Sequence, residues 1–163
     1  MAVKIAKAMG AEVTLFTTTP GKAEDAKKLG ADHVVISKDP EQMEGVAGTL
    51  DLIIDSVAAP HDLDAYFATL AREGSLVLLG VPPQPHPSPN VFNFIRGRRS
   101  LSGSLIGGIA ETQEMLDFCA EHGVTADVEM ISMDQIDAAY DRMESSDVKY
   151  RFVIDMESMP AAA

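Results

Sequence analysis

Hydroxyl groups and one ammonium group are concentrated in a short segment that contains Thr17, Thr18, Thr19 and Lys22. Hydroxyl side chains donate hydrogen bonds and a lysine supplies a compact positive charge, so this group is suited to binding a phosphate. A simpler interpretation of these residues is equally compatible with the sequence. Thr19 followed by Pro20 is a common start of a helix, and Lys22 would then be a solvated surface residue.

Other kinds of chemistry find little support in the residue types. The four histidines have no spacing to one another or to a cysteine that is typical of a zinc site; they are His33, His61, His86 and His122. The single cysteine, Cys119, falls on the apolar side of an expected helix, where cysteine usually only packs. The sequence contains no Gly-x-Ser-x-Gly nucleophile motif. We therefore expect no catalytic residue and no metal ligand set in this chain.

Short apolar runs alternate with segments of helical periodicity along most of the chain. Strands are expected at 12–17, 33–36, 50–55, 75–80, 101–106 and 150–154, and helices at 1–9, 20–29, 40–46, 62–70, 111–122 and 136–143. The prolines that recur between residues 82 and 89 predict an irregular loop. Continuous apolar strands separated by helices indicate a parallel sheet with helices on both faces.

This alternation predicts an α/β fold with a Rossmann-like, doubly wound parallel sheet. The first strand and the glycine loop of such a sheet are missing from the sequence, so the sheet is expected to be truncated. An acidic residue usually holds the ribose of NAD at the end of the second strand, but here Thr17–Thr19 and Lys22 follow that strand. Hydroxyls and a cation suit a 2′-phosphate, which indicates NADP rather than NAD.

The carboxyl ends of the other expected strands are further candidate positions, because ligands of open α/β sheets bind beyond those ends. They are expected at Ser56, at Gly80 and at the segment Ser104–Ile106. A glycine such as Gly80 would allow a ligand to approach the backbone closely. Each position is weak evidence by itself, since small residues are common at the ends of parallel strands.

The charge balance argues against several classes of partner. The chain of 163 residues has 25 acidic and 13 basic residues and a net charge of −12, which disfavours nucleic acid. The local cluster of Arg96, Arg98 and Arg99 is more typical of a solvated or interface patch than of an anion site. No apolar run is long enough to span a membrane, and Lys4 and Lys7 interrupt the first apolar stretch. Together with the single cysteine, these features predict a cytoplasmic protein without a membrane partner.

Several separated segments resemble the zinc-dependent, medium-chain alcohol dehydrogenases: Met1–Val13, Lys28–Asp32, Asp51–Val57, Ser104–Gly108 and Tyr150–Asp155. The first of them resembles the helix that follows the Gly-Leu-Gly-Gly-Leu-Gly-His turn of that family. Within the family, the similarity is to the cinnamyl-alcohol-dehydrogenase-like branch, whose members reduce aldehydes with NADPH. The resemblance extends over nearly the whole chain, which on this basis looks like a C-terminal piece that starts at an internal methionine.

The resemblance also implies roles for individual residues. Thr17, Thr18, Thr19 and Lys22 match the loop that holds the 2′-phosphate, Ser56 matches a contact on the nicotinamide side, and Gly80, Ser104, Leu105 and Ile106 match backbone contacts to the nicotinamide end. Because the glycine cradle for the pyrophosphate is missing, cofactor binding is expected to be weak or lost. Residues 1–123 then form a truncated dinucleotide-binding domain, and residues 124–163 form the segment that returns to the catalytic domain in the family.

The catalytic zinc of the family is held by a domain that this sequence lacks, so zinc is expected in the parent family only. The resemblance therefore implies a partial NADP-dependent alcohol dehydrogenase or aldehyde reductase, which acts in the parent on a small alcohol or aldehyde and is inactive as an isolated chain. Two alternatives stay open. One is a non-catalytic module that binds a nucleotide or dimerises, and the other is a mis-started reading frame without a function of its own.

Self-association is expected from the missing strand, which is central in the strand order 3-2-1-4-5-6. Its loss leaves strands 12–17 and 51–54 with one unpaired edge each, and unpaired apolar edges favour strand pairing. These two strands should either pair directly or borrow a strand from a second copy. The resemblance implies a dimer contact near Leu101–Ile106, so we expect a homodimer built around residues 91–106.

Overall fold

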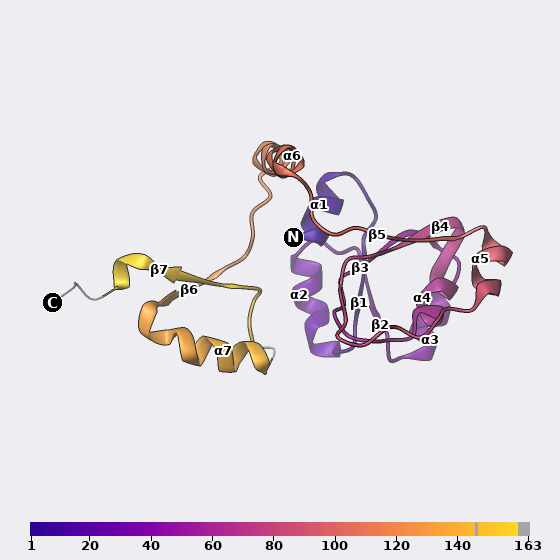
Figure 1. Ribbon diagram of the computed structural model, residues 1–163, viewed down its shortest axis with the longest axis horizontal. Coiled ribbons are helices and arrows are strands. Elements are labelled where there is room, and N and C mark those ends of the chain that lie inside the picture. Colours follow the sequence, from indigo (N-terminus) through magenta and orange to yellow (C-terminus); the bar gives the residue numbers. More distant parts are fainter. Residues whose placement is uncertain (146, 160–163) are drawn as a thin grey trace. The chain divides into compact units, whose positions relative to one another are not determined.

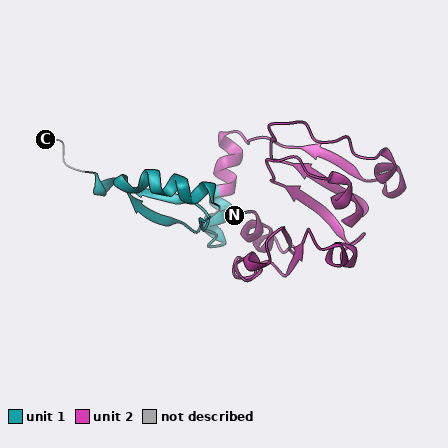
Figure 2. Cartoon of the chain, turned by 90° about the horizontal axis from the view of Figure 1, so that it is seen from below, with its two compact units in different colours: residues 1, 116–163 teal, residues 2–115 magenta. Residues whose placement is uncertain are grey.

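A computed structural model describes residues 1–145 and 147–159 of the chain. These residues divide into two compact units, which Figure 2 shows in different colours. The larger unit is Ala2–Met115, and the smaller unit is Met1 together with Leu116–Ala163. The two units are described separately below.

Helices and strands alternate through the larger unit, as the sequence predicts (Figure 1). In chain order its elements are α1 (Ala2–Ala8), β1 (Thr14–Thr17), the short 3-10 helix η1 (Pro20–Lys22), α2 (Ala23–Lys28), β2 (His33–Ile36), α3 (Pro40–Gly45), β3 (Leu50–Asp55), α4 (Leu63–Thr69), β4 (Leu70–Leu78), α5 (Val91–Gly97) and β5 (Ser100–Gly103). Helix α6 (Ile109–Glu121) crosses the division between the units.

The strands of the larger unit form two separate parallel sheets, with the orders β1-β2 and β3-β4-β5. Thr14 pairs with His33 in the first sheet, and Ile53 pairs with Leu76 in the second. The mixed α/β architecture with parallel strands confirms the predicted Rossmann-like fold class. Of the two outcomes expected for the open edges, direct pairing of β1 with β3 does not occur, because the two strands lie in different sheets. Pairing with a second copy stays a prediction. Leu52 and Ile54 are 55% and 48% exposed and alternate with the buried Ile53, so one face of β3 is covered by the core and the other is open.

Short polar side chains start several of these helices. The Asp39 carboxylate accepts hydrogen bonds from the backbone N–H groups of Glu41 and Gln42 at the start of α3, and Asp62 accepts one from Asp64 at the start of α4. Thr19 stands at the corresponding position before η1, but its side chain makes no capping hydrogen bond. A helical turn thus begins at Thr19-Pro20 and Lys22 is exposed, as the simpler interpretation expects, but the Thr19 hydroxyl does not cap the turn.

The core of the larger unit lies between the β3-β4-β5 sheet and α4. Its fully buried apolar side chains are Phe67, Leu70 and Leu76, and Ile53 and Leu63 complete the cluster. Helix α5 closes one side of this core through Phe94. The ring centroids of Phe67 and Phe94 lie 4.6 Å apart. Burial of these side chains supplies most of the driving force that positions the ends of the three strands.

The structure corrects several of the expected elements. Strand β5 ends at Gly103, so residues 104–106 are not part of it. Beyond that glycine the chain leaves the sheet, and the side chains of Leu105 and Ile106 are 80% and 87% exposed. Helix α5 was not predicted. In α6, Cys119 is buried, in agreement with its expected place on the apolar side of a helix, whereas Met115 and Leu116 are 39% and 52% exposed.

The smaller unit is a parallel strand pair joined by a helix. Its remaining elements are β6 (Glu129–Ser132), the 3-10 helix η2 (Met133–Gln135), α7 (Ile136–Glu144), β7 (Phe152–Asp155) and the 3-10 helix η3 (Met156–Ser158). A capping box starts this helical segment, in which the Gln135 side chain accepts the backbone N–H of Ser132 at 3.0 Å. Strand β6 was not predicted, and β7 starts two residues later than expected.

An ion pair links the three main elements of the smaller unit. The guanidinium group of Arg142 on α7 lies 2.7 Å from the Glu129 carboxylate on β6 and over the ring of Phe152 on β7. The backbone N–H of Lys149 also donates to Glu129, at 2.9 Å. This backbone hydrogen bond and the hydrogen bond from Arg142 hold the pKa of Glu129 below its usual value.

Candidate functional site

The predicted positions Ser56, Gly80 and Ser104 lie together at the carboxyl end of the β3-β4-β5 sheet. Ser56 follows β3 directly, and Ser104 follows β5 directly. The Asp55 carbonyl accepts the backbone N–H of Gly80 at 3.2 Å, and the Leu78 carbonyl accepts that of Ser104 at 3.1 Å. These hydrogen bonds connect the segments that leave the three strands, as parallel strand geometry requires.

Gly80 has a structural role that differs from the expected one. A Cβ atom on this residue would lie 2.3 Å from the carbonyl oxygen of Val57, which is far inside van der Waals contact. We expected the glycine to leave room for a ligand, but the room is taken by the turn that follows β3. Gly80 therefore sets how closely the two segments that leave β3 and β4 pack.

The carboxylate of Asp55 fixes the same turn from inside the protein. Its side chain is 8% exposed, and its Oδ1 atom accepts the backbone N–H of Val57 at 3.0 Å. Ser56 itself is exposed. The buried carboxylate thus holds the backbone while the side chain of Ser56 faces solvent beside the strand ends.

The hydroxyl-and-lysine loop follows β1, in the other sheet. Thr17 accepts the backbone N–H of Thr19 on its Oγ1 atom at 3.2 Å, and Thr18 and Thr19 are exposed. The backbone N–H of Lys22 donates to the Thr19 carbonyl at 3.1 Å, which brings Lys22 back toward the threonines within one turn. The Lys22 side chain is exposed, and the segment from Thr17 to Lys22 contains no acidic residue. The loop can therefore present hydroxyls and a positive charge to an anion.

A ring contact connects β1 with the helix layer of the other sheet. The Phe16 ring meets the edge of the Tyr66 ring on α4, with the centroids 5.4 Å apart. The structure thus brings Ser56, Gly80 and Ser104 to one end of the sheet through hydrogen bonds of Gly80 to Asp55 and of Ser104 to Leu78, and Thr17–Lys22 forms a second group. Leu105 and Ile106 extend from the first group into solvent.

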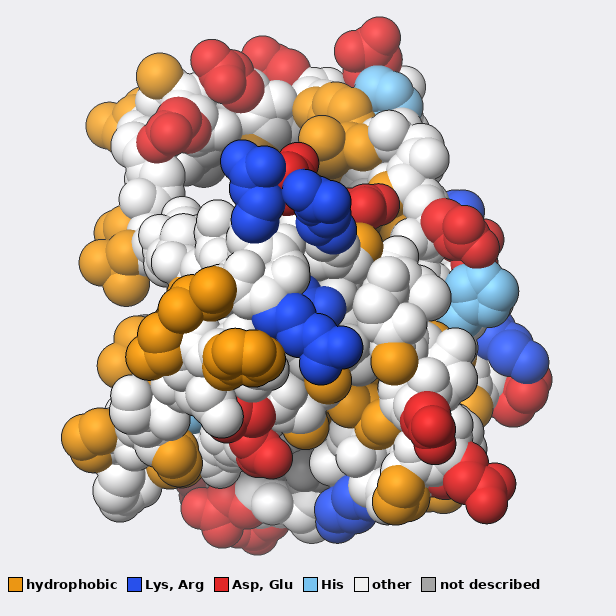
Figure 3. Space-filling model, turned by 90° about the vertical axis from the view of Figure 1, so that its right-hand side faces the viewer, with side chains coloured by type: hydrophobic (Ala, Val, Ile, Leu, Met, Phe, Trp, Pro, Cys, Tyr) orange, Lys and Arg blue, Asp and Glu red, His pale blue; other side chains and the backbone are white. Residues whose placement is uncertain are grey.

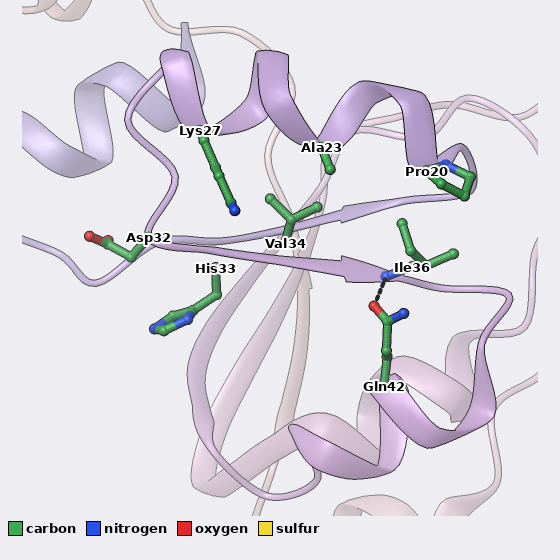
Figure 4. Close-up of a pocket in the computed structure, with 8 residues that line it drawn as sticks. All are labelled: Pro20, Ala23, Lys27, Asp32, His33, Val34, Ile36 and Gln42. Atoms are coloured by element: carbon green, nitrogen blue, oxygen red, sulfur yellow. Dashed lines mark hydrogen bonds between the residues drawn. The ribbon is translucent and has the colours of Figure 1, made fainter.

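An open groove of about 440 Å³ lies along β2, and Pro20 and Ala23, next to the predicted loop residues Thr19 and Lys22, are among the residues that line it. Figure 4 shows Ala23 and Lys27 of α2 on one side of this strand and Gln42 of α3 on the other. The side-chain oxygen of Gln42 accepts the backbone N–H of Ile36 at 2.9 Å. Because this contact occupies a donor at the free edge of β2, the groove is poorly suited to strand addition. None of the predicted site residues lines it.

The arginine cluster is largely engaged in contacts within the chain. Figure 3 shows Lys and Arg side chains gathered on one face with acidic side chains beside them. Arg98 lies 3.3 Å from Glu73, and Arg99 donates to the backbone carbonyl of Ala71 at 3.3 Å. These contacts agree with a surface patch that is partly neutralised by its neighbours.

The described residues contain no group of three or more histidine, cysteine or acidic side chains that is arranged to hold a metal ion. The same residues form no helix that combines the length and the apolar character of a membrane span.

The family model for zinc-binding dehydrogenases matches residues 1–121. Among curated proteins, an aldehyde reductase of Escherichia coli (strain K12), YahK, is 55% identical over 159 residues, which are 98% of this chain and 46% of the relative. A cinnamyl alcohol dehydrogenase of Sorghum bicolor matches the whole chain with a TM-score of 0.93, at 43% identity and over 46% of its own length. A cinnamyl alcohol dehydrogenase from Helicobacter pylori, solved in complex with NADP(H), matches with a TM-score of 0.84 at 41% identity. This match covers 98% of the present chain and 45% of the Helicobacter pylori chain.

The chain spans slightly less than half the length of these relatives. Its matching part carries the strand ends and the loop described above. The chain belongs to the zinc-binding dehydrogenase family and corresponds to the C-terminal, cofactor-side part of a zinc-dependent medium-chain alcohol dehydrogenase of the cinnamyl-alcohol-dehydrogenase-like branch.

Proposed function

We propose that this chain provides the cofactor-binding half of an NADP-dependent alcohol dehydrogenase or aldehyde reductase. The cofactor preference rests on the loop after β1, where the segment from Thr17 to Lys22 offers three hydroxyls and a lysine and contains no acidic residue. The next carboxylates, Glu24 and Asp25, belong to the first turn of α2. A carboxylate at this place would repel a 2′-phosphate, whereas hydroxyls and an ammonium group attract it. The NADP(H) complex of the Helicobacter pylori relative supports this assignment.

The second part of the proposed site is the carboxyl end of the β3-β4-β5 sheet. Ser56 and the backbone near Gly80, Ser104, Leu105 and Ile106 would contact the nicotinamide end of the cofactor. When bound, the cofactor supplies the hydride of the reaction. The residues of this chain bind it and orient its ring, and the small alcohol or aldehyde would be held mainly by parts of the enzyme outside this chain.

The described residues do not fit a zinc site, because they offer no set of converging ligands. We therefore assign no step of the reaction to zinc in this chain, and we propose that the isolated chain has no dehydrogenase activity. Residues 124–163 are proposed to be the segment that returns to the catalytic domain in a full-length enzyme. A cytoplasmic location stays a prediction.

The chain is further proposed to form a homodimer through residues 91–106. Exposed apolar side chains support this interface: Val91, Phe92 and Ile95 on α5, and Leu105 and Ile106 after β5. Strand β5 is also the last strand of its sheet in the described part of the chain, so one of its edges is available for pairing. These observations also favour the second candidate function, a dimerisation module that does not catalyse a reaction.

Calorimetric titration of the purified chain with NADPH and, separately, with NADH tests the cofactor assignment. Binding of NADPH with higher affinity than NADH is expected, although both affinities should be low without the pyrophosphate cradle. Tighter binding of NADH would contradict the assigned preference. If neither nucleotide binds, the isolated chain is not a cofactor-binding unit, and the dimerisation module becomes the better description.

A further inference from the structure

The buried carboxylate of Asp55 has a second polar neighbour beyond the Val57 backbone. Its Oδ2 atom lies 2.9 Å from Nε2 of His61, and the two side chains are 8% and 19% exposed. Apart from this ion-pair contact, Oδ2 has no hydrogen-bond partner among the described residues. A buried carboxylate oxygen is unfavourable unless it is paired, so the His61 ring is the group that offsets its burial.

Both ring nitrogens of His61 are held in place. The Nδ1 atom lies 2.9 Å from the carbonyl oxygen of Ala59, which can only accept a hydrogen bond, so Nδ1 carries a hydrogen in this contact. The Nε2 atom faces Asp55. The ring also meets Tyr66 edge to face, with the centroids 5.4 Å apart. His61 is therefore fixed between the end of β3, the turn that follows it and helix α4.

The same histidine touches the proline-rich segment 82–90. The backbone N–H of His61 donates to Nδ1 of His86 at 3.5 Å, and the two rings pack edge to face with their centroids 4.8 Å apart. This segment is irregular and has few backbone hydrogen bonds of its own in the described structure. Its position therefore depends on side-chain contacts of this kind.

We propose that Asp55 and His61 are positioning residues, which hold the turn at residues 56–58 and couple it through His86 to the proline-rich segment 82–90. The coupling follows from the contacts given above. Only the description of residues 56–58 as part of a cofactor site rests on the proposed function. Loss of the His61 ring would free the turn and the segment together.

A separate anchor provides an internal reference for this proposal. The Asp64 carboxylate accepts the backbone N–H of Asn90 at 2.9 Å and the side-chain amide of Asn93 at 2.8 Å. This contact fixes the end of the segment 82–90 without His61. A change that acts through His61 should therefore affect Gln84, His86 and Ser88 but not the amide of Asn90.

Backbone amide hydrogen exchange and amide-nitrogen relaxation, measured by NMR on the full chain, test the coupling. In His61→Ala we expect exchange at Val57, whose N–H the Asp55 carboxylate accepts, to accelerate about tenfold, because that carboxylate loses its ring partner. Relaxation at His86 and Ser88 should show larger backbone motion, and the Asn90 amide should keep its exchange rate. The control is His33→Ala, which removes a ring that is 57% exposed and pairs with Glu12. Unchanged relaxation in residues 84–88, or an equal rise in exchange at Asn90, would overturn the proposal.

Two further variants keep the test decisive if His61→Ala folds poorly. His86→Ala removes the acceptor of the His61 N–H, so it should accelerate exchange at His61 and increase backbone motion at Gln84 and Ser88. It should leave Val57 as it is, because the Asp55 contact remains. Asp55→Asn retains an oxygen that accepts the Val57 N–H, so it should protect that amide better than Asp55→Ala does. Equal effects of Asn and Ala at residue 55 would contradict the positioning role of the carboxylate.

An NADPH titration separates this inference from the proposed function. If the wild-type chain binds NADPH, His61→Ala should weaken the affinity about tenfold, and His33→Ala should not change it. Unchanged affinity in His61→Ala would contradict a role of the turn in cofactor binding. If the wild-type chain does not bind NADPH, the cofactor assignment fails, and the exchange experiment still decides whether His61 couples the two segments.

Discussion

The carbonyl oxygen of Val57 occupies the space in which a side chain at residue 80 would begin, 2.3 Å from the ideal Cβ position on Gly80. The opposing atoms belong to the backbone, so rotation of a side chain cannot relieve the contact. We predict that Gly80→Ala lowers the free energy of unfolding by about 1–3 kcal/mol, the usual cost of overpacking. Urea unfolding of the variant and the wild type measures this difference.

Gly45→Ala is the matched control for that substitution. Gly45 ends α3, and a Cβ on it would meet no atom within 4 Å. Alanine at this position should leave the free energy of unfolding unchanged or raise it by up to about 1 kcal/mol. If Gly80→Ala proved as stable as Gly45→Ala, the close packing of residues 57 and 80 would not be present in solution.

Phe67 is the center of the apolar core and is fully buried. Its replacement by alanine leaves a cavity between α4 and the sheet, and we expect a loss of about 3–5 kcal/mol of unfolding free energy. Met9→Ala removes a large side chain that is 72% exposed and lies outside residues 91–106, and it should change the stability by less than about 0.5 kcal/mol. Thermal or urea unfolding of both variants distinguishes the two environments.

Asp32 makes the stability of the larger unit depend on pH. The backbone N–H of Val13 donates to its carboxylate at 2.7 Å and the ammonium group of Lys7 at 2.9 Å. These two contacts hold the pKa of Asp32 below its usual value. The unfolded chain then binds a proton more readily than the folded chain. The stabilisation is present above the unfolded pKa of about 3.9 and is lost as the pH falls through the folded pKa.

We therefore predict that Asp32→Asn is less stable than the wild type at neutral pH and that the difference shrinks on acidification to about pH 3. Unfolding curves in urea over this pH range measure it. Asp51→Asn removes an exposed carboxylate on β3 of the same unit and serves as the control. If the difference in unfolding free energy between the wild type and Asp32→Asn grew as the pH fell, the proposed link between stability and the lowered pKa of Asp32 would be refuted.

Strands β2 and β3 were predicted with the bounds that the structure has, because buried parallel strands are continuous apolar runs with polar or glycine boundaries. Helix α5 was missed because three of its apolar side chains are exposed and give no one-sided pattern. Asn90, whose side chain accepts the backbone N–H of Phe92, was the available signal. Strand β6 has only two apolar residues, and its pairing with β7 is a tertiary contact that local sequence does not encode.

The candidate site was likewise predictable from the sequence only in part. Ser56, Gly80 and Ser104 could be placed at one edge of the sheet because parallel strands end on the same side. The contact of Asp55 with His61 and His86 could not be predicted. It depends on the path of residues 82–90, which prolines make irregular without fixing its direction. A carboxylate at the end of a strand and two isolated histidines carry no spacing signal.

Lys22→Ala tests the loop after β1 directly. If the ammonium group contacts a 2′-phosphate, its removal should weaken NADPH binding about tenfold and leave NADH binding unchanged, because NADH has no phosphate at that place. Lys28→Ala is the control, since Lys28 is an exposed residue of α2 that lies 3.7 Å from Asp25. Equal losses for both nucleotides in Lys22→Ala would show that the lysine does not distinguish them.

The exposed apolar residues of α5 should control self-association. Ile95 is 69% exposed and lies within the segment proposed to form the dimer. A charged side chain at the center of such an interface must be desolvated without a partner, so Ile95→Glu should shift the chain toward the monomer. Light scattering at micromolar concentration measures the mass of each variant. Val81→Glu introduces the same charge at a site that is 74% exposed but outside residues 91–106, and it should keep the wild-type mass. A wild-type chain that is monomeric and unfolds cooperatively would mean that neither this segment nor the open edges of β1 and β3 recruit a second copy.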